Sequence, residues 1–460
     1  MASSAERTAP EKTARMPPGI PYIVGNEAAE RFSFYGMRAI LVVFMTQYLR
    51  DRHGALAPMK DNDANFWYHL FVSSNYFFPI GGAILADAIW GKYRTIFWLS
   101  LVYCCGHFAL AIDDTRVGLA MGLTLIALGS GGIKPCVSAN VGDQFTAANQ
   151  HLIERAFGWF YFSINVGSCF SILLIPWLLQ HYGSNVAFAV PGVLMAIATL
   201  VFWMGRRKFV HIPARGKTFF KDVLNREGLS TLGRLGIIYV FVAVFWSLWD
   251  QTGGEWVLQA DKMDLHFAGI TWLASQIQFL NAIMILLFIP TFQYVIYPAI
   301  NMVFPLTPLR KIGLGLLVTG SSFLVSAWIE RQLAAGLHPS IGWQIPAYAL
   351  VTAGEIMVSI TSLEFSYTQA PTAMKSIVMA IYLWSISAGN LFTALVHLFI
   401  QNPDGTVKLS GSSYYLFFAG LAAAAAVIFA FVALRYREKT YLQEAAFPEN
   451  LPPSEAAPVA

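Results

Sequence analysis

The chain has 460 residues, of which 56% are hydrophobic and only 12% are charged, and its net charge is +4. Soluble domains carry about 25% charged residues, so most of this surface cannot face water. The small net charge and the lack of a basic–aromatic patch argue against nucleic-acid binding. The four cysteines have no zinc-ligand spacing, so we expect no metal site and no cofactor.

Mostly apolar stretches of about 20 residues, the length needed to cross a bilayer, occur about twelve times. They cover residues 21–49, 66–88, 93–112, 117–139, 155–180, 186–205, 232–259, 268–299, 308–329, 341–368, 375–401 and 412–436. We therefore predict an all-α membrane protein with about twelve transmembrane helices.

Lysine and arginine in the short loops predict the orientation of these helices. The segment 206–234 is densely basic, and basic residues also gather at 92–94, 310–311 and 435–439, whereas the opposite loops are poorer in them. By the positive-inside rule, both termini lie in the cytoplasm. The stretch 219–224 either lies on the membrane surface as an amphipathic segment or is plain solvated linker.

The basic linker divides the chain into two sets of six helices, which is the layout of the major facilitator superfamily. The expected parts are a cytoplasmic N-terminal tail at 1–20, an N-terminal six-helix bundle at 21–205, a cytoplasmic linker at 206–231, a C-terminal six-helix bundle at 232–437 and a cytoplasmic C-terminal tail at 438–460.

The segment 82–94 resembles the superfamily's signature loop between the second and third helices. Within it, Asp87 can accept hydrogen bonds at a helix end and Gly91 permits a tight turn. This motif concerns fold and gating and says nothing of a substrate.

The first helix carries charges that an apolar helix should lack. Each charge costs about 2.5–3.5 kcal/mol at the bilayer centre, so the helix must turn them away from lipid. At helical periodicity, a wedge of roughly 100° holds Glu27, Arg31, Phe34, Tyr35 and Arg38, with Glu30 at its edge. This face lines either a water-filled cavity or, since Glu27 and Arg31 can pair locally, a buried ion-pair cluster without a transport role.

Isolated polar groups lie at comparable depth in other helices. They are Lys134, Asn165, Asp250, Asn281 and Glu355, with tyrosine hydroxyls at 35, 76 and 161. Cations belong mainly to the first half and carboxylates to the second, so a cavity between the halves has a positive and a negative side. An arginine can grip a carboxylate in bidentate fashion, and a carboxylate suits an ammonium, so the cavity suits a dipolar substrate.

Proton coupling also has a physical basis here. A carboxylate in a low-dielectric cavity holds its proton more tightly, and a nearby cation opposes this. A substrate that competes for the cation links protonation to affinity, with Glu27, Glu30 and Asp250 as the candidates. An unperturbed histidine titrates near neutral pH, so His69 is a further candidate for proton coupling. The alternative is that His69 is a structural, hydrogen-bonded histidine.

Several motifs in order resemble the proton-coupled oligopeptide transporter family. They are E-x-x-E-R-F at 27–32, G-S-G-G-I-K-P at 129–135, F-Y-F-S-I-N-V-G at 160–167, the pairs 245–246 and 250–251, Asn281, and Glu355 through E-F-S-Y-T-Q-A-P at 364–371. The resemblance runs from the first to the eleventh helix and is weak in the termini.

The resemblance implies a role for each matching residue. Those implied to contact the peptide carboxylate are Arg31, Arg38 and Lys134. Those implied to hold the peptide amine are Asn165, Asn281 and Glu355, and Tyr35 and Tyr76 match tyrosines that line the site. Glu27, Glu30 and Asp250 match residues implicated in proton coupling, and His69 matches a histidine typical of animal members.

Three positions depart from the family pattern. Phe34 replaces the first tyrosine of a pair and removes a hydroxyl. Glu255 stands where some members have a basic residue, so a salt-bridge gate there would be absent or inverted. The eleventh-helix tryptophan is shifted, with Tyr382 and Trp384 on either side of its usual position. The large external domain of animal members is also missing, so a minimal bacterial-type member is expected.

The resemblance implies a symporter in the cell (inner) membrane that imports di- and tripeptides with protons by alternating access, with peptide-like drugs as a further class of partner. One rival is a transporter of the same fold for nitrate, a drug or an amino acid conjugate. Another is an intramembrane enzyme, which the scattered histidines do not support. A third is a receptor-like protein, which the short tails do not favour.

Overall fold

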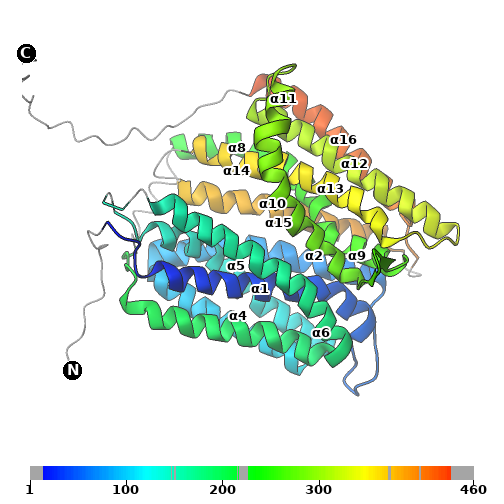
Figure 1. Cartoon of the computed structure of the whole chain (residues 1–460), viewed down its shortest axis with the longest axis horizontal. Coiled ribbons are helices and arrows are strands. Elements are labelled where there is room, and N and C mark those ends of the chain that lie inside the picture. The colour runs from blue at the N-terminus through cyan, green and yellow to red at the C-terminus, as the bar shows by residue number, and fades with distance from the viewer. Residues whose placement is uncertain are drawn as a thin grey trace, which may run out of the picture.

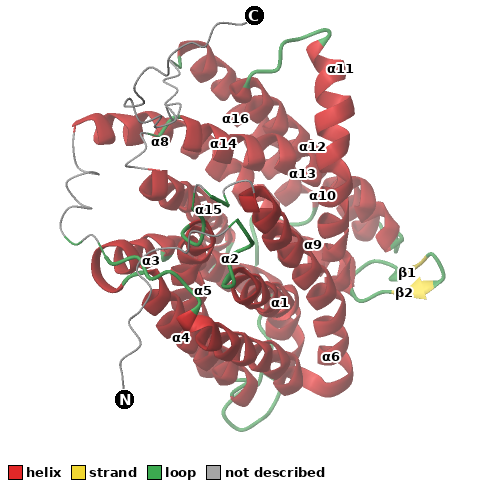
Figure 2. Cartoon of the chain, turned by 60° about the vertical axis from the view of Figure 1, so that its left-hand side comes forward, coloured by secondary structure: helices red, strands yellow, loops and turns green. Residues whose placement is uncertain are grey.

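The computed structural model describes residues 14–146, 148–149, 152–214, 216, 226–370, 375–402 and 406–436. The predicted amphipathic stretch 219–224 and most of both tails lie outside these ranges. The structure is almost entirely helical, with one short hairpin formed by β1 (His266–Phe267) and β2 (Ile270–Thr271) (Figure 2).

The first half contains five long helical runs. They are α1 (Ile20–Val43) continued by the π-helix η1 (Phe44–Tyr48), α2 (Asp61–Phe77) continued by α3 (Pro79–Ile84) and η2 (Leu85–Trp90), α4 (Lys92–Ile112), α5 (Arg116–Gly142) and α6 (Ile153–Met204). α6 is two spans rather than one, because Gly183 has φ 81° and breaks the helical path. The short 3-10 turn η4 (Gly205–Arg207) ends this half.

The second half contains six runs interrupted by short irregular turns. They are α8 (Arg226–Trp249) with η5 (Asp250–Gly253) and α9 (Glu255–Asp261); η6 (Ala274–Gln278) with α10 (Phe279–Thr291), η7 (Phe292–Ile296) and α11 (Tyr297–Asn301); α12 (Pro308–Ala334); η8 (Ile341–Trp343) with α13 (Gln344–Glu355), η9 (Ile356–Ile360) and α14 (Thr361–Thr368); α15 (Lys375–Ile400); and α16 (Ser412–Arg435).

In the described residues, nine helices are long and apolar enough to cross a membrane. One of these nine holds two spans because of the break at Gly183, and the charged α1 and the composite α2–α3–η2 run add two more. The total of twelve agrees with the fold class predicted from the sequence. The protein is thus a multi-pass membrane protein.

Two helix starts differ from the apolar pattern. α8 covers Arg226–Trp249, so its described part already includes residues of the expected linker, because its polar first turns continue the helix beyond the apolar part. The run that holds the eighth predicted span begins at Ala274 rather than near 268, because the preceding residues form the β hairpin. The apolar pattern of a sequence predicts the part of a helix that lies in the membrane, but it does not predict where the helix itself begins and ends.

The first turn of α1 and the last turn of α16 lie on one side of the molecule, called here the chain-end side, and the opposite side carries the loop 49–60 and the hairpin (Figure 1). We call the second side the distal face. Figure 1 shows α1, α4, α5 and α6 grouped together, and α12, α13 and α16 grouped on the other side. α2 packs along α15 and thereby connects the two groups.

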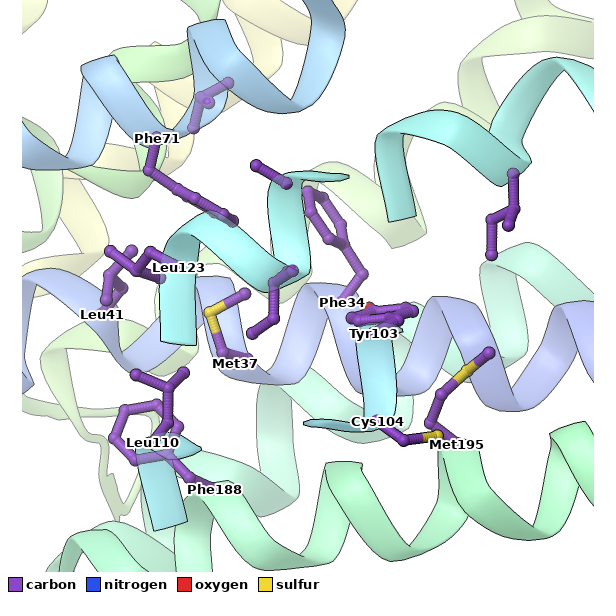
Figure 3. Packing of buried hydrophobic residues seen from close by; sticks show 14 of the residues in the cluster. Phe34, Met37, Leu41, Phe71, Tyr103, Cys104, Leu110, Leu123, Phe188 and Met195 are labelled. Atoms are coloured by element: carbon purple, nitrogen blue, oxygen red, sulfur yellow. The ribbon is translucent and has the colours of Figure 1, made fainter. Parts of the chain in front are cut away.

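The apolar core of the first group surrounds the middle of α1. Phe34 and Met37 from α1 lie among Phe71, Tyr103 and Leu123 of the neighbouring helices (Figure 3). Phe34 shares its helix face with the charged residues Glu27, Arg31 and Arg38, so this cluster borders the charged stripe of α1 rather than lying opposite it. The ion pairs of these charged residues show which side of α1 faces the interior between the two groups.

Close helix packing in this core depends on small residues. A Cβ atom on Gly82 would lie 1.9 Å from the carbonyl oxygen of Gly132 on α5. Small residues allow such backbone approach between membrane helices, where water does not drive association. The G-A-I-L-A-D signature thus begins with a packing contact.

Candidate functional site

Two glutamates of α1 hold one arginine. Arg31 Nε lies 2.6 Å from Glu27 Oε1 and 2.9 Å from Glu30 Oε2. Ser130 of α5 donates a hydrogen bond of 2.9 Å to Glu30. All three charged side chains are shielded from lipid, as predicted from their place in an apolar helix. When both glutamates are ionised, the group has a net charge of about −1.

Arg38 connects the two halves of the protein. Its guanidinium forms an ion pair with Asp250 of η5 and donates a 2.7 Å hydrogen bond from Nε to the Tyr68 hydroxyl. The rings of Tyr68 and Trp249 also lie 5.6 Å from the guanidinium carbon. The ion pair is buried, so removing either partner would leave an uncompensated charge.

Lys134 of α5 has no hydrogen-bond partner for its amine in the described part of the protein. Its Nζ lies 4.3 Å from the centroid of the Phe34 ring and 4.0 Å from that of Tyr76. Aromatic faces attract a cation, but they satisfy none of its three N–H donors. The departure at Phe34 therefore leaves the ammonium free to donate to an anion.

Glu355 is the negative group of the second half. It accepts hydrogen bonds from Asn281 Nδ2 at 2.7 Å and from Trp249 Nε1 at 2.8 Å. Asn281 also donates to the hydroxyl of Thr352, at 3.0 Å. Glu355 ends α13 where the helix widens into the π-helix η9, and such π turns frequently occur at functional sites.

Tyrosines lie between these groups. Tyr35 and Tyr76 are half-buried, and Tyr35 interacts electrostatically with Arg31, Arg38 and Glu355, which come from both halves. Asn165 on α6 is buried. The Tyr161 side chain lies outside the described part of the structure.

His69 belongs to the Arg38 network rather than to the Arg31 group. Its Nδ1 lies 2.8 Å from Asn390 Oδ1, and Asn390 Nδ2 donates to Asp250. Asn390 thus joins a histidine of α2 to a carboxylate of η5. Asn390 is absent from the residues predicted from the sequence, although a polar residue inside an apolar membrane helix is a signal for such a role. Tyr68 and Trp249 were likewise not identified as partners.

The signature loop lies apart from these groups, near the chain ends. Gly91 has φ 81°, a backbone conformation that favours glycine, and it separates η2 from α4. The adjacent Lys92 donates a 2.6 Å hydrogen bond to Asp143 at the end of α5. Asp87 lies within η2. These residues bind the loop to its own half of the protein.

The remaining departures also have defined partners. Trp384 donates from Nε1 to the Phe77 carbonyl at 3.1 Å and stacks on the Phe77 ring. Tyr382 donates to the Ser359 carbonyl at 3.2 Å. Glu255 accepts a 2.9 Å hydrogen bond from Asn65 and forms no ion pair with a lysine or arginine in the described residues.

Within the described part of the chain, histidine, cysteine and carboxylate side chains form no group of three or more that would hold a metal ion. The arrangement is instead one of separated charges. The first half contributes an unsatisfied ammonium and two paired arginines, Arg31 and Arg38, and the second half contributes a hydrogen-bonded carboxylate.

Comparison with known proteins places the chain in a family. A sequence profile described as "POT family" matches residues 93–226 and 223–413. Peptide transporter family 1 of Drosophila melanogaster is 34% identical over 376 residues, which are 70% of this chain and 50% of the fly protein. Human solute carrier family 15 member 2 is 36% identical over 367 residues, covering 69% and 49% of the two chains. The chain thus spans about half the length of the curated relatives it matches.

Solved structures match over nearly their whole length. The in meso crystal structure of the POT family transporter PepTSo has a TM-score of 0.83 and 37% identity, covering 92% of this chain and 99% of that chain. The crystal structure of an auto-inhibited POT family peptide transporter has a TM-score of 0.84 and 35% sequence identity, covering 93% of this chain and 99% of that chain. The curated relatives compared are animal proteins, so the bacterial type stays a prediction. The chain belongs to the POT family.

Proposed function

We propose that this protein is a proton-coupled symporter that imports di- and tripeptides by alternating access. The observation that carries the proposal is the buried, unsatisfied ammonium of Lys134, which faces an interior whose other side holds Glu355. A buried charge without hydrogen bonds is costly unless a ligand supplies them. A peptide carboxylate would accept hydrogen bonds from Lys134. The ammonium at the other end of the same peptide would bind Glu355, with the amide oxygen of Asn281 beside it.

Two ion pairs supply a means of coupling to protons. Arg31 is held by Glu27 and Glu30, and a substrate carboxylate must compete with them for the guanidinium. A proton on either glutamate weakens that competition and raises the affinity for the carboxylate. Protonation of Asp250 would likewise release Arg38, and the ion pair between the halves would be lost. Protons are then the coupling ion, and no cofactor is needed.

We place the protein in the cell (inner) membrane with both termini in the cytoplasm, because the basic linker and loops occur on the side of the chain ends. The distal face is then the outer face. The apolar clusters support this proposed division at the linker, because one is built mainly from residues 20–209 and the other three are built from residues 235–429. The tails at 1–20 and 438–460 and the linker complete this proposed division.

The names of related structures support peptides and peptide-like compounds as the substrates of this protein. One related transporter, 25% identical, was solved in complex with alafosfalin. The retention of both a cationic and an anionic side favours a peptide over nitrate, which has no ammonium for Glu355. Transport of a drug or of an amino acid conjugate by the same site is the alternative.

Uptake of a labelled dipeptide into proteoliposomes tests the proposal. Uptake should rise when the outside is made acidic relative to the inside and should collapse when a protonophore removes the gradient. Folding is checked by the melting temperature of the same preparation. Folded protein that shows no gradient-dependent uptake, while exchanging dipeptide at equal pH, would refute proton coupling; no exchange at all would refute peptide transport.

A further inference from the structure

The distal face holds a polar cavity that leads toward the proton-coupling residues. It has a volume of about 180 Å³ and is lined by residues that include Asp61, Glu255, Gln259, Lys262 and Glu330. Three carboxylates share it with one lysine, whose Nζ lies 3.0 Å from Asp61. The cavity therefore favours cations, including protons, over anions.

Accessibility decreases inward along a series of titratable side chains. The Asp61 side chain is 50% exposed, that of Glu255 is 21% exposed, and that of His397 is 1% exposed. Glu255 Oε1 lies 3.9 Å from His397 Nε2. The ring of His397 on α15 stacks on that of His69 on α2, with centroids 6.0 Å apart and an angle of 13° between planes. His69 continues through Asn390 to Asp250.

The hydrogen bonds of His397 determine which nitrogen can accept a proton. Asn62 uses its Nδ2 to donate to the His397 carbonyl, so its Oδ1, 2.8 Å from His397 Nδ1, accepts from an Nδ1–H. In the neutral ring Nε2 then carries the lone pair, and it accepts from the Tyr414 hydroxyl at 3.0 Å. This same Nε2 faces Glu255.

The same reasoning applies to His69. Asn390 donates from Nδ2 to Asp250, so its Oδ1 accepts from His69 Nδ1–H. His69 Nε2 is buried and has no hydrogen-bond partner in the described part of the chain. In each of the two stacked rings, Nε2 is thus the nitrogen that can accept a proton. A positive charge on one ring disfavours protonation of the other, because like charges repel.

We infer that His397 is a proton-accepting residue of the transport cycle, charged through Glu255 from the distal cavity and paired with His69 so that the two rings hold one proton. The inference rests on the proposed symport. A proton from the distal solution binds Glu255 Oε1 and moves to His397 Nε2. From there it passes to His69 Nε2, through a water molecule or a rotation of the His397 side chain, and each donor returns to its neutral or ionised starting form.

Other charges face this series and set its response to pH. From each neighbouring element they are Arg38 on α1, Asp61 and His69 on α2, Asp250 on η5, Glu255 on α9 with Lys262 after it, Glu330 on α12, and Tyr414 and Tyr415 on α16. The carboxylates favour a proton on His397, and Arg38 and Lys262 oppose it. Acidification of the distal side should therefore load the histidine pair.

The test compares two modes of transport in proteoliposomes that carry His397→Gln, Glu255→Gln or a control, His181→Gln. His181 is an exposed histidine of α6 two residues before the break at Gly183, and its Nδ1 lies 2.9 Å from the Trp177 carbonyl oxygen of the same helix. One assay measures dipeptide uptake driven by an acidic outside, and the other measures dipeptide exchange at equal pH, which needs no net proton movement.

For His397→Gln we expect driven uptake to fall about fivefold or more, the lower end of typical coupling between two ligand sites, while exchange stays within about twofold of wild type. Glu255→Gln, which keeps the Asn65 hydrogen bond, should lower driven uptake in the same selective way. His181→Gln should change neither assay.

Wild-type driven uptake by both variants, with exchange intact, would overturn the inference. If His397→Gln loses both modes through misfolding, Glu255→Gln decides the question by the same criterion. Failure of wild type to show driven uptake would instead count against the proposed symport, so the two failures are distinguishable.

Discussion

Arg31 and Arg38 each contact carboxylates, whereas Lys134 contacts only the faces of two aromatic rings. This difference separates the roles of three cations that look equivalent in the sequence. The arginines take part in internal ion pairs that a proton can open. Lys134 has no such partner among the described residues, so it is the cation available to a substrate without a prior exchange of partners.

Glu355→Gln tests the opposite end of the site. The amide keeps the size and one hydrogen-bonding oxygen for Asn281 but loses the charge that binds an ammonium. Hydrogen bonds to charged groups contribute about 1.5–3 kcal/mol, so affinity for a dipeptide with a free amine should fall about tenfold or more. Affinity for an N-acetylated analogue should change much less, as measured by competition for dipeptide exchange.

The control for this change is Glu364→Gln, an exposed glutamate on α14 in the same part of the chain. It should leave both affinities unchanged. Equal losses for the free and the blocked peptide in Glu355→Gln would contradict the assignment of Glu355 to the amine.

The individual charges were predictable from the sequence, but their partners were not. A charge in an apolar helix must face inward, and this placed Arg31, Lys134 and Glu355 correctly toward the interior. The partner depends on the relative depth and rotation of two helices that are far apart in the chain. For that reason the links through Asn390 and the interaction of Arg38 with Tyr68 became visible only in the structure.

At the level of elements, α2 and α15 form an antiparallel polar series. From the chain-end side to the distal face, the pairs are Phe77 with Trp384, Ser73 with Ser387, His69 with Asn390, and Asn62 with His397. The spacings of three, four and seven residues follow one face of each helix. Apolar patterning predicted both helices, but the polar face they share has too few residues to stand out as a motif.

Gly82→Ala tests the close packing of α3 against α5. The added Cβ would lie 1.9 Å from the Gly132 carbonyl oxygen, so the helices must move apart. Overpacking of this kind typically costs about 1–3 kcal/mol, and the melting temperature in detergent should fall. Gly81→Ala is the matched control, because nothing lies within 4 Å of a Cβ there. Equal melting temperatures for the two variants would show that the contact does not stabilise the fold.

At the scale of the whole molecule, hydrogen bonds between the halves gather at the distal face. Gln47 donates to Asp261 at 2.9 Å, Lys262 to Asp61 at 3.0 Å, and Gln276 to the Leu173 carbonyl at 2.9 Å. Opening the distal face requires that these contacts separate together with the Arg38–Asp250 ion pair. Several weak exposed contacts and one buried ion pair thus hold this conformation.

A cross-link between Gln47→Cys and Asp261→Cys tests this requirement. Both positions are exposed on the distal face, so a short thiol-reactive linker should join them. The joined protein should bind dipeptide yet lose both driven uptake and exchange, whereas a linker cleavable by reduction should allow recovery. Each single-cysteine variant, treated with the same reagent, controls for modification of the chain's own four cysteines. Normal transport by the cross-linked protein would mean that the distal halves need not separate.

The bare ammonium of Lys134 also has a consequence for how ligands of this protein can be found. No described side chain accepts a hydrogen bond from the three N–H groups of this buried amine. A compound that accepts these hydrogen bonds binds the folded state but not the unfolded chain. By mass action such a compound raises the melting temperature, and the rise grows with the logarithm of its concentration once that concentration exceeds its dissociation constant. A thermal-shift screen in detergent would therefore rank carboxylate-bearing compounds by affinity before any vesicle is prepared, and compounds that bind without being transported would be found in the same screen.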